Sequence, residues 1–176
     1  ILATLPNLIS LEAQVCHTFP ISELLNSTSL SIISIICSKT AFAFAGEEML
    51  RLAKNLEHNT TLSVLSLEPF ICSNVALPAI LHVLKTSNRC LETFQFSCGI
   101  ATFEQGDWAL EQMLDTLEAN STLRVLWNNC YESWSVTAPM RQRALQVLKQ
   151  HQSIEQFHVY PEPADYWYRK NSILHG

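Results

Sequence analysis

The chain has 176 residues, a length typical of one domain. Hydrophobic residues make up 48% of it and charged residues 15%, a composition that excludes an intrinsically disordered segment. The net charge of −5 argues against a non-specific nucleic-acid binder, because such proteins are normally basic.

A Leu-x-x-Leu-x-Leu motif recurs along the chain. It is weak at residues 8–13 and fits at 30–35, 62–67 and 91–96. It keeps two anchors at 123–128 and has apolar residues at all three anchors at 154–159. Successive motifs start 22, 32, 29, 32 and 31 residues apart, and their first anchors are Leu8, Leu30, Leu62, Leu91, Leu123 and Ile154. The alternation within each motif predicts a short strand.

A segment with helical periodicity precedes four of these motifs. Apolar residues recur three or four apart over 49–56, 80–84, 110–117 and 144–148, which predicts amphipathic helices. Asn59, Asn88 and Asn120 stand in the polar turns that follow, where Asn suits a helix C-terminal cap. Stacking such units predicts an α/β solenoid of about five to six repeats, with a parallel sheet on the concave face and helices outside.

The repeat resembles the leucine-rich repeat family, in its long, ribonuclease-inhibitor-like class. The run Leu-x-x-x-Leu-x-x-Asn-x-x-Leu-x-x-Leu-x-Leu carries the resemblance, best over residues 52–67, 118–126 and 150–159. It implies a right-handed α/β superhelix that binds other proteins. The sequence departs from the family at the Asn/Cys position after each strand, which only Cys16 occupies.

A narrower resemblance concerns residues 52–62 and 113–123. These segments are similar to the repeats of the tropomodulin capping domain, and equally to short repeat proteins of algae and protists. The tropomodulin resemblance implies capping of actin filament pointed ends. The aromatic stretch at 165–171 is similar to the segment that ends such protist chains.

Two regions are expected from the extent of the repeat. Residues 1–160 are expected to form the solenoid. We expect it to be a fragment without its N-terminal cap, because no helical segment longer than residues 1–5 precedes the first motif at Leu8. Residues 161–176, with three consecutive aromatic residues at 166–168, are expected to form a C-terminal cap or tail.

The candidate chemistry of the chain is sparse. The six cysteines include no CxxC pair, so we expect free thiols in an intracellular protein, cytoplasmic or organellar. Cys37, Cys98 and Cys130 each lie seven residues after a first anchor and form either a buried core row or a metal or redox ladder. Because no His or carboxylate recurs in phase, the core row is favoured. Without a HExxH or Gly-x-Ser-x-Gly motif, we predict no enzyme, metal, cofactor or small-molecule substrate.

Three sequons, at Asn26, Asn59 and Asn120, fall in turns of the repeat. They are either glycan acceptors or capping residues, and their shared place in the repeat favours capping. No run approaches the ~18 apolar residues of a membrane span, so no span is predicted.

The residues between the motif anchors point away from the core and define a concave face. The candidate partner-binding residues on it are Glu12, Glu68, Gln95, Val125, Trp127, Asn129, His158 and Tyr160. Four of them, Val125, Trp127, His158 and Tyr160, would cluster near the C-terminal end as an interface hot spot. Alternatively, the loop 131–138 with Trp134 covers Trp127.

Two functional hypotheses follow. The first is a non-catalytic protein–protein interaction scaffold, which binds a protein through the concave face or belongs to a multi-subunit complex. The second is tropomodulin-like capping of actin filaments.

Overall fold

A computed structural model describes residues 7–15, 20–37, 46–68, 76–96, 103–128, 136–159 and 168–169. Strands and helices alternate along the chain. The strands are β1 (Ser10–Val15), β2 (Ile32–Cys37), β3 (Val64–Glu68), β4 (Thr93–Phe96), β5 (Val125–Asn128), β6 (Gln156–Val159) and β7 (Tyr168–Arg169). The helices are α1 (Ile21–Leu24), α2 (Gly46–His58), α3 (Ala76–Thr86), α4 (Phe103–Ala119) and α5 (Ala138–Gln150).

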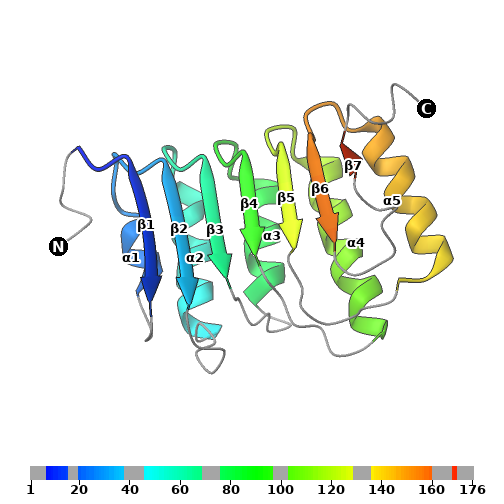
Figure 1. The fold of residues 1–176 in the computed structure, drawn as a ribbon, viewed down its shortest axis with the longest axis horizontal. Coiled ribbons are helices and arrows are strands. Elements are labelled where there is room, and N and C mark those ends of the chain that lie inside the picture. The colour runs from blue at the N-terminus through cyan, green and yellow to red at the C-terminus, as the bar shows by residue number, and fades with distance from the viewer. Residues whose placement is uncertain are drawn as a thin grey trace.

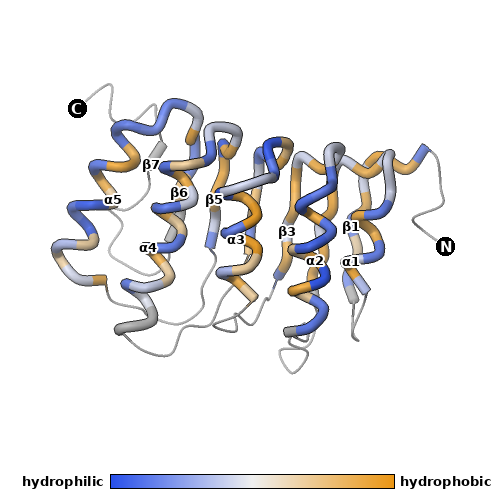
Figure 2. Tube along the Cα trace, turned by 180° about the vertical axis from the view of Figure 1, so that it is seen from behind, coloured by the Kyte–Doolittle hydropathy of each residue, from blue (hydrophilic) through white to orange (hydrophobic). Residues whose placement is uncertain are grey.

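The strands form one sheet in chain order, β1 to β7 (Figure 1). Strands β1 to β6 run parallel, and β7 pairs with β6 in the antiparallel direction. The five helices of the described ranges lie on one face of this sheet, as the view from behind shows (Figure 2). The predicted α/β fold of leucine-rich-repeat-like units, with a parallel sheet on one side and helices on the other, is confirmed.

The core lies between the sheet and the helices. Motif anchors fill it from one side, and the first anchors Leu30, Leu62, Leu91, Leu123 and Ile154 are all buried. The helical stripes fill it from the other side, with Met49, Leu52 and Leu56 of α2 fully buried. Burying one such side chain contributes about 1.5–3 kcal/mol, so the repeated anchors supply the main stabilisation.

A ladder of asparagine side chains joins the turns between each helix and the next strand. Asn88 Nδ2 donates to the carbonyls of Leu56 (2.8 Å) and Asn59 (3.1 Å), which belong to the preceding unit. Its Oδ1 accepts from the backbone N–H groups of Cys90 and Leu91. Each buried asparagine therefore closes its own turn and binds the turn before it.

The same contacts recur along the chain. Asn120 Nδ2 donates to the carbonyls of Leu84 (2.6 Å) and Asn88 (3.3 Å), and Asn59 Nδ2 to that of Leu25 (2.9 Å). His151 takes the next position: its Nδ1 accepts from Ile154 N–H at 3.0 Å, so Nε2 carries the proton and donates to the Asn120 carbonyl at 2.8 Å. The residues at the predicted capping positions thus also link neighbouring units, through hydrogen bonds of their side chains.

The sequon at Asn26 does not share the position of the other two. Asn26 lies four residues before its motif anchor and is exposed, whereas Asn59 and Asn120 lie three residues before theirs and are buried. Ser27 occupies the equivalent buried position in its unit. The expectation that all three sequons sit alike in the repeat is wrong for Asn26, because the sequon there starts one residue before the buried position.

Candidate protein-binding surfaces

The solvent face of the sheet, here the strand face, consists of rows that cross the strands. Parallel pairing places Glu12, Ser34, Ser66, Gln95, Trp127 and His158 in one row. A second row contains Ser10, Ile32, Val64, Thr93, Val125 and Gln156. A third begins with Gln14, Ile36 and Glu68. The pairing confirms the register expected from the motif for these residues. Successive side chains of a strand point to opposite faces, so the residues between anchors face away from the helices.

The C-terminal part of the strand face brings Gln95, Val125 and Trp127 close together. Trp127 pairs directly with Gln95 in the neighbouring strand, and all three side chains are half-buried. His158 is next to Trp127 in the register, but its side chain lies outside the described residues, as do Asn129 and Tyr160. The loop residues 131–135, including Trp134, also lie outside them.

The N-terminal part of the strand face contains a feature that the candidate residues did not include. Ile36 is 50% exposed although it is a large aliphatic residue. Its register neighbours are Gln14 on β1 and Glu68 on β3, and Glu12 lies two residues before Gln14 on β1. The alternation of the motif places Ile36 outward. Aromatic residues are enriched at interface hot spots, so the motif alone favours Trp127 over Ile36 as a binding residue.

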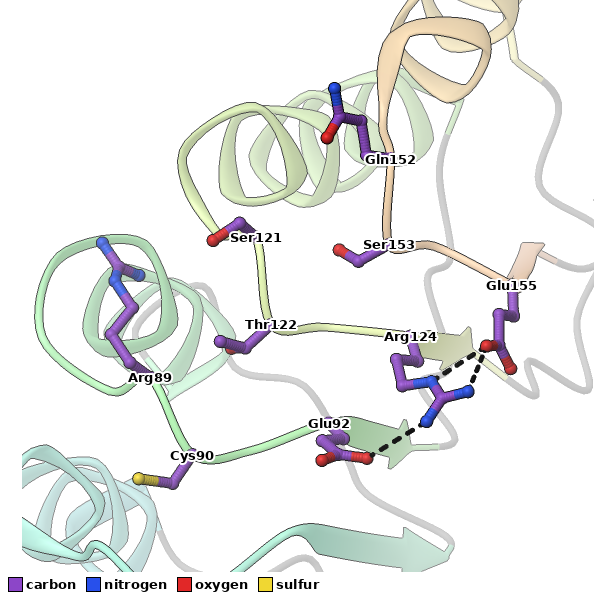
Figure 3. A pocket seen from close by; sticks show the side chains of 9 residues that line it. All are labelled: Arg89, Cys90, Glu92, Ser121, Thr122, Arg124, Gln152, Ser153 and Glu155. Atoms are coloured by element: carbon purple, nitrogen blue, oxygen red, sulfur yellow. Dashed lines mark hydrogen bonds and ion pairs between the residues drawn. The ribbon is translucent and has the colours of Figure 1, made fainter.

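A hollow of about 350 Å³ opens at the edge where the turns enter the strands (Figure 3). Three successive turns line it, with the residues Arg89, Cys90, Glu92, Ser121, Thr122, Arg124, Gln152, Ser153 and Glu155. Similar hollows recur along this edge, one of them beside Asn26 and Thr28. They arise because each unit contributes a separate turn, and the spaces between neighbouring turns stay open.

Arg124 is held between two carboxylates in this hollow (Figure 3). Its Nε lies 2.9 Å from Glu155 Oε1, and its Nη1 lies 3.7 Å from Glu92 Oε2. The hydrogen bond to Glu155 raises the pKa of the Arg124 guanidinium, with a smaller contribution from Glu92. Because the three side chains are about half exposed, the pairs contribute little stability, and they leave the hollow without a strong charge preference.

A second set of ion pairs links the helices. Arg143 of α5 contacts three carboxylates of α4, with its Nη2 2.6 Å from Asp115 Oδ1. Lys85 of α3 reaches the other oxygen of Asp115 at 3.3 Å. The Arg143 hydrogen bond, followed by Lys85, lowers the pKa of Asp115 despite partial burial. Asp115 therefore connects three consecutive helices.

The remaining sequence expectations concern metals and membranes. In the described part of the chain, no three His, Cys, Asp or Glu residues come together as a metal site. None of the helices among these residues combines the length and the apolar character that crossing a membrane requires. Of the predicted cysteine row, Cys98, Cys130 and the side chain of Cys37 lie outside the described residues, whereas Cys90 is a half-buried free thiol.

Comparison with known proteins gives a likeness in structure. No protein-family model matches the chain, and no curated protein matches it in sequence. Among solved structures, it is similar to "Leiomodin-1 Actin-Binding Site 2 (ABS2)" with a TM-score of 0.64 and 17% sequence identity. The match covers 82% of this chain and 79% of that chain. At this identity the likeness shows the leucine-rich-repeat-like fold, which both chains share over most of their length.

Proposed function

We propose that this chain is a non-catalytic protein-binding domain and that its partner is actin. The observation that carries the proposal is the shared fold with an actin-binding region over four-fifths of the chain. In this account the protein acts inside the cell, where Cys90 remains reduced, and caps the pointed ends of filaments.

The sequence segments similar to tropomodulin support the fold more than the partner. Asn59 and Asn120 are their most distinctive residues, and both are buried in the ladder between units. Residues that hold the turns together are not free to contact a filament. The choice of actin therefore needs a direct test.

The test is elongation of actin filaments whose barbed ends are blocked, followed with pyrene-labelled actin. A capping protein at micromolar concentration slows growth from the remaining pointed ends, and this inhibition saturates as its concentration rises. Unchanged growth across the micromolar range would discard capping. A matched reaction with free barbed ends separates capping from monomer sequestration, because sequestration slows growth at both ends.

A second candidate function is a scaffold that binds another protein through the C-terminal part of the strand face. It is favoured by Val125 and Trp127, half-buried side chains that lie on neighbouring rows of that face. Aromatic residues of this kind dominate many interfaces.

Affinity purification from native extract tests the scaffold with the wild type and Trp127→Ala. Loss of a stable partner set in the variant, with an unchanged circular dichroism spectrum, supports this surface. An identical partner set for both proteins argues that binding occurs elsewhere.

A further inference from the structure

Aliphatic and acidic side chains lie together at the N-terminal end of the strand face. This acidic–aliphatic patch consists of Glu12 on β1, Ile32 and Ile36 on β2, and Val64 and Glu68 on β3. Ile32 and Val64 pair in the register, as do Ile36 and Glu68. The patch is thus continuous over three strands and belongs to none of the hollows at the turn edge.

Exposure and charge distinguish this patch from the rest of the strand face. Ile36 is 50% exposed and Glu12 is exposed, whereas Ile33 and Ile35 on the same strand are fully buried. On the strand face of β1 to β6, the described side chains include these two carboxylates and no Lys or Arg. The patch therefore complements a ligand that carries positive charge beside an apolar side chain.

The register fixes how far apart the two carboxylates are. Glu12 and Glu68 are two strands and two residues apart, which corresponds to about 12 Å between their Cα atoms at ordinary strand spacings. The midpoint lies between Ser34 and Ile36 of β2. In an extended peptide, residues i and i+4 face the same side and are ~13 Å apart, which matches this separation.

We propose that the acidic–aliphatic patch docks an extended segment of a partner protein with the pattern basic-x-apolar-x-basic. The two basic side chains pair with Glu12 and Glu68, and the apolar side chain packs on Ile36. The inference rests on the proposed protein-binding function, but it does not depend on actin as the partner.

The test uses two synthetic peptides and nuclear magnetic resonance titration of the whole ¹⁵N-labelled chain. One peptide contains Lys-Ser-Leu-Ser-Lys between Gly-Ser flanks, and the other replaces both lysines with glutamate. We expect the lysine peptide to shift amides of β1, β2 and β3 and to bind at least about tenfold more tightly than the glutamate peptide. We also expect affinity to fall when salt rises from low to high concentration.

Variants then separate this site from general electrostatic attraction. Glu12→Lys combined with Glu68→Lys reverses the peptide preference, and Ile36→Ser weakens binding of the lysine peptide about tenfold. The double variant Glu23→Lys with Glu57→Lys is the matched control, because it changes two exposed helix carboxylates and leaves the patch intact. We expect this control variant to bind the lysine peptide more tightly than the glutamate peptide, as the wild type does.

Several outcomes would overturn the inference. They are absence of binding, equal binding of both peptides, shifts confined to the surroundings of Trp127, and equal effects of the patch and control variants. The actin assay is independent: peptide binding without an effect on filaments rejects actin while retaining the patch, and the reverse result rejects the patch alone.

Discussion

Individual side chains at one position of the repeat hold neighbouring units together. Asn59, Asn88, Asn120 and His151 each satisfy buried backbone groups in their own turn and in the turn before. An unsatisfied buried group costs about 1–3 kcal/mol, so these side chains contribute more than their exposed neighbours. The sequence identifies their positions through spacing, but it does not reveal the contacts across units, which depend on how the units stack.

Asn120→Ala is expected to lower the free energy of unfolding by about 3 kcal/mol. The substitution removes the hydrogen bonds of the side-chain amide to the backbone of Leu84, Asn88, Thr122 and Leu123. Chemical denaturation with urea measures the change. Asn26→Ala removes the same amide from an exposed turn and should change stability by less than about 0.5 kcal/mol. Equal effects of the two substitutions would contradict the ladder.

A hydroxyl position next to the ladder is filled in some units and not in others. Thr61 Oγ1 donates to the Leu30 carbonyl at 3.1 Å, and Thr122 Oγ1 to the Leu91 carbonyl at 3.4 Å. Cys90 stands at the same place in its unit. Cys90→Thr should therefore add a hydrogen bond to the preceding unit and raise stability by about 0.5–1 kcal/mol.

Cys90→Val is the control for this substitution, because valine has the shape of threonine and no hydroxyl. Thermal unfolding of both variants provides the comparison. If valine stabilises as much as threonine, the gain comes from shape and the hydroxyl explanation fails.

At the scale of elements, helices α3, α4 and α5 are linked by charge as well as by the core. Asp115 joins Lys85 and Arg143, whose guanidinium also contacts Glu111 and Glu118. These contacts require residues about 30 positions apart to lie side by side, and the repeat period alone does not select which charged residues meet.

Asp115→Asn tests the contribution of this network through its pH dependence. The native pKa of Asp115 is lowered, so its stabilisation is present above the unfolded pKa near 4 and is lost as the pH falls through the lower native value. At neutral pH the variant should be less stable by about 1 kcal/mol or less, because the pair is partly exposed. Below pH 4 the difference between the two proteins should shrink, as urea denaturation at pH 6 and pH 3 would show. A constant difference would contradict the assignment.

The elements themselves were largely predictable from the sequence. Alternating anchors predict β2 to β6 and their register, because a motif that repeats with a nearly constant period leaves one way to align the strands. The antiparallel pairing of β7 with β6 was not predictable, since residues 168–169 break the repeat and only a cap or tail was expected there. The outward direction of Ile36 follows from the motif, but its 50% exposure also depends on the side chains that surround it on the sheet.

At the scale of the whole molecule, one repeated unit accounts for the architecture. Each unit buries its apolar faces only against the next, so the fold follows from the period and does not require a particular function. The function must therefore depend on the surfaces of the molecule. The strand face has a candidate binding surface at each end: Trp127 with Val125 at the C-terminal end and the acidic–aliphatic patch at the N-terminal end. The fold shared with an actin-binding region provides the most specific partner to test.

The most direct test is the binding of fluorescently labelled protein to actin, measured with monomers by anisotropy and with filaments by sedimentation. We predict saturable binding at micromolar concentration to at least one of the two forms, with Asn26→Ala binding as the wild type does. Absence of binding to both forms at tens of micromolar, with the protein folded, would contradict the proposal that actin is the partner.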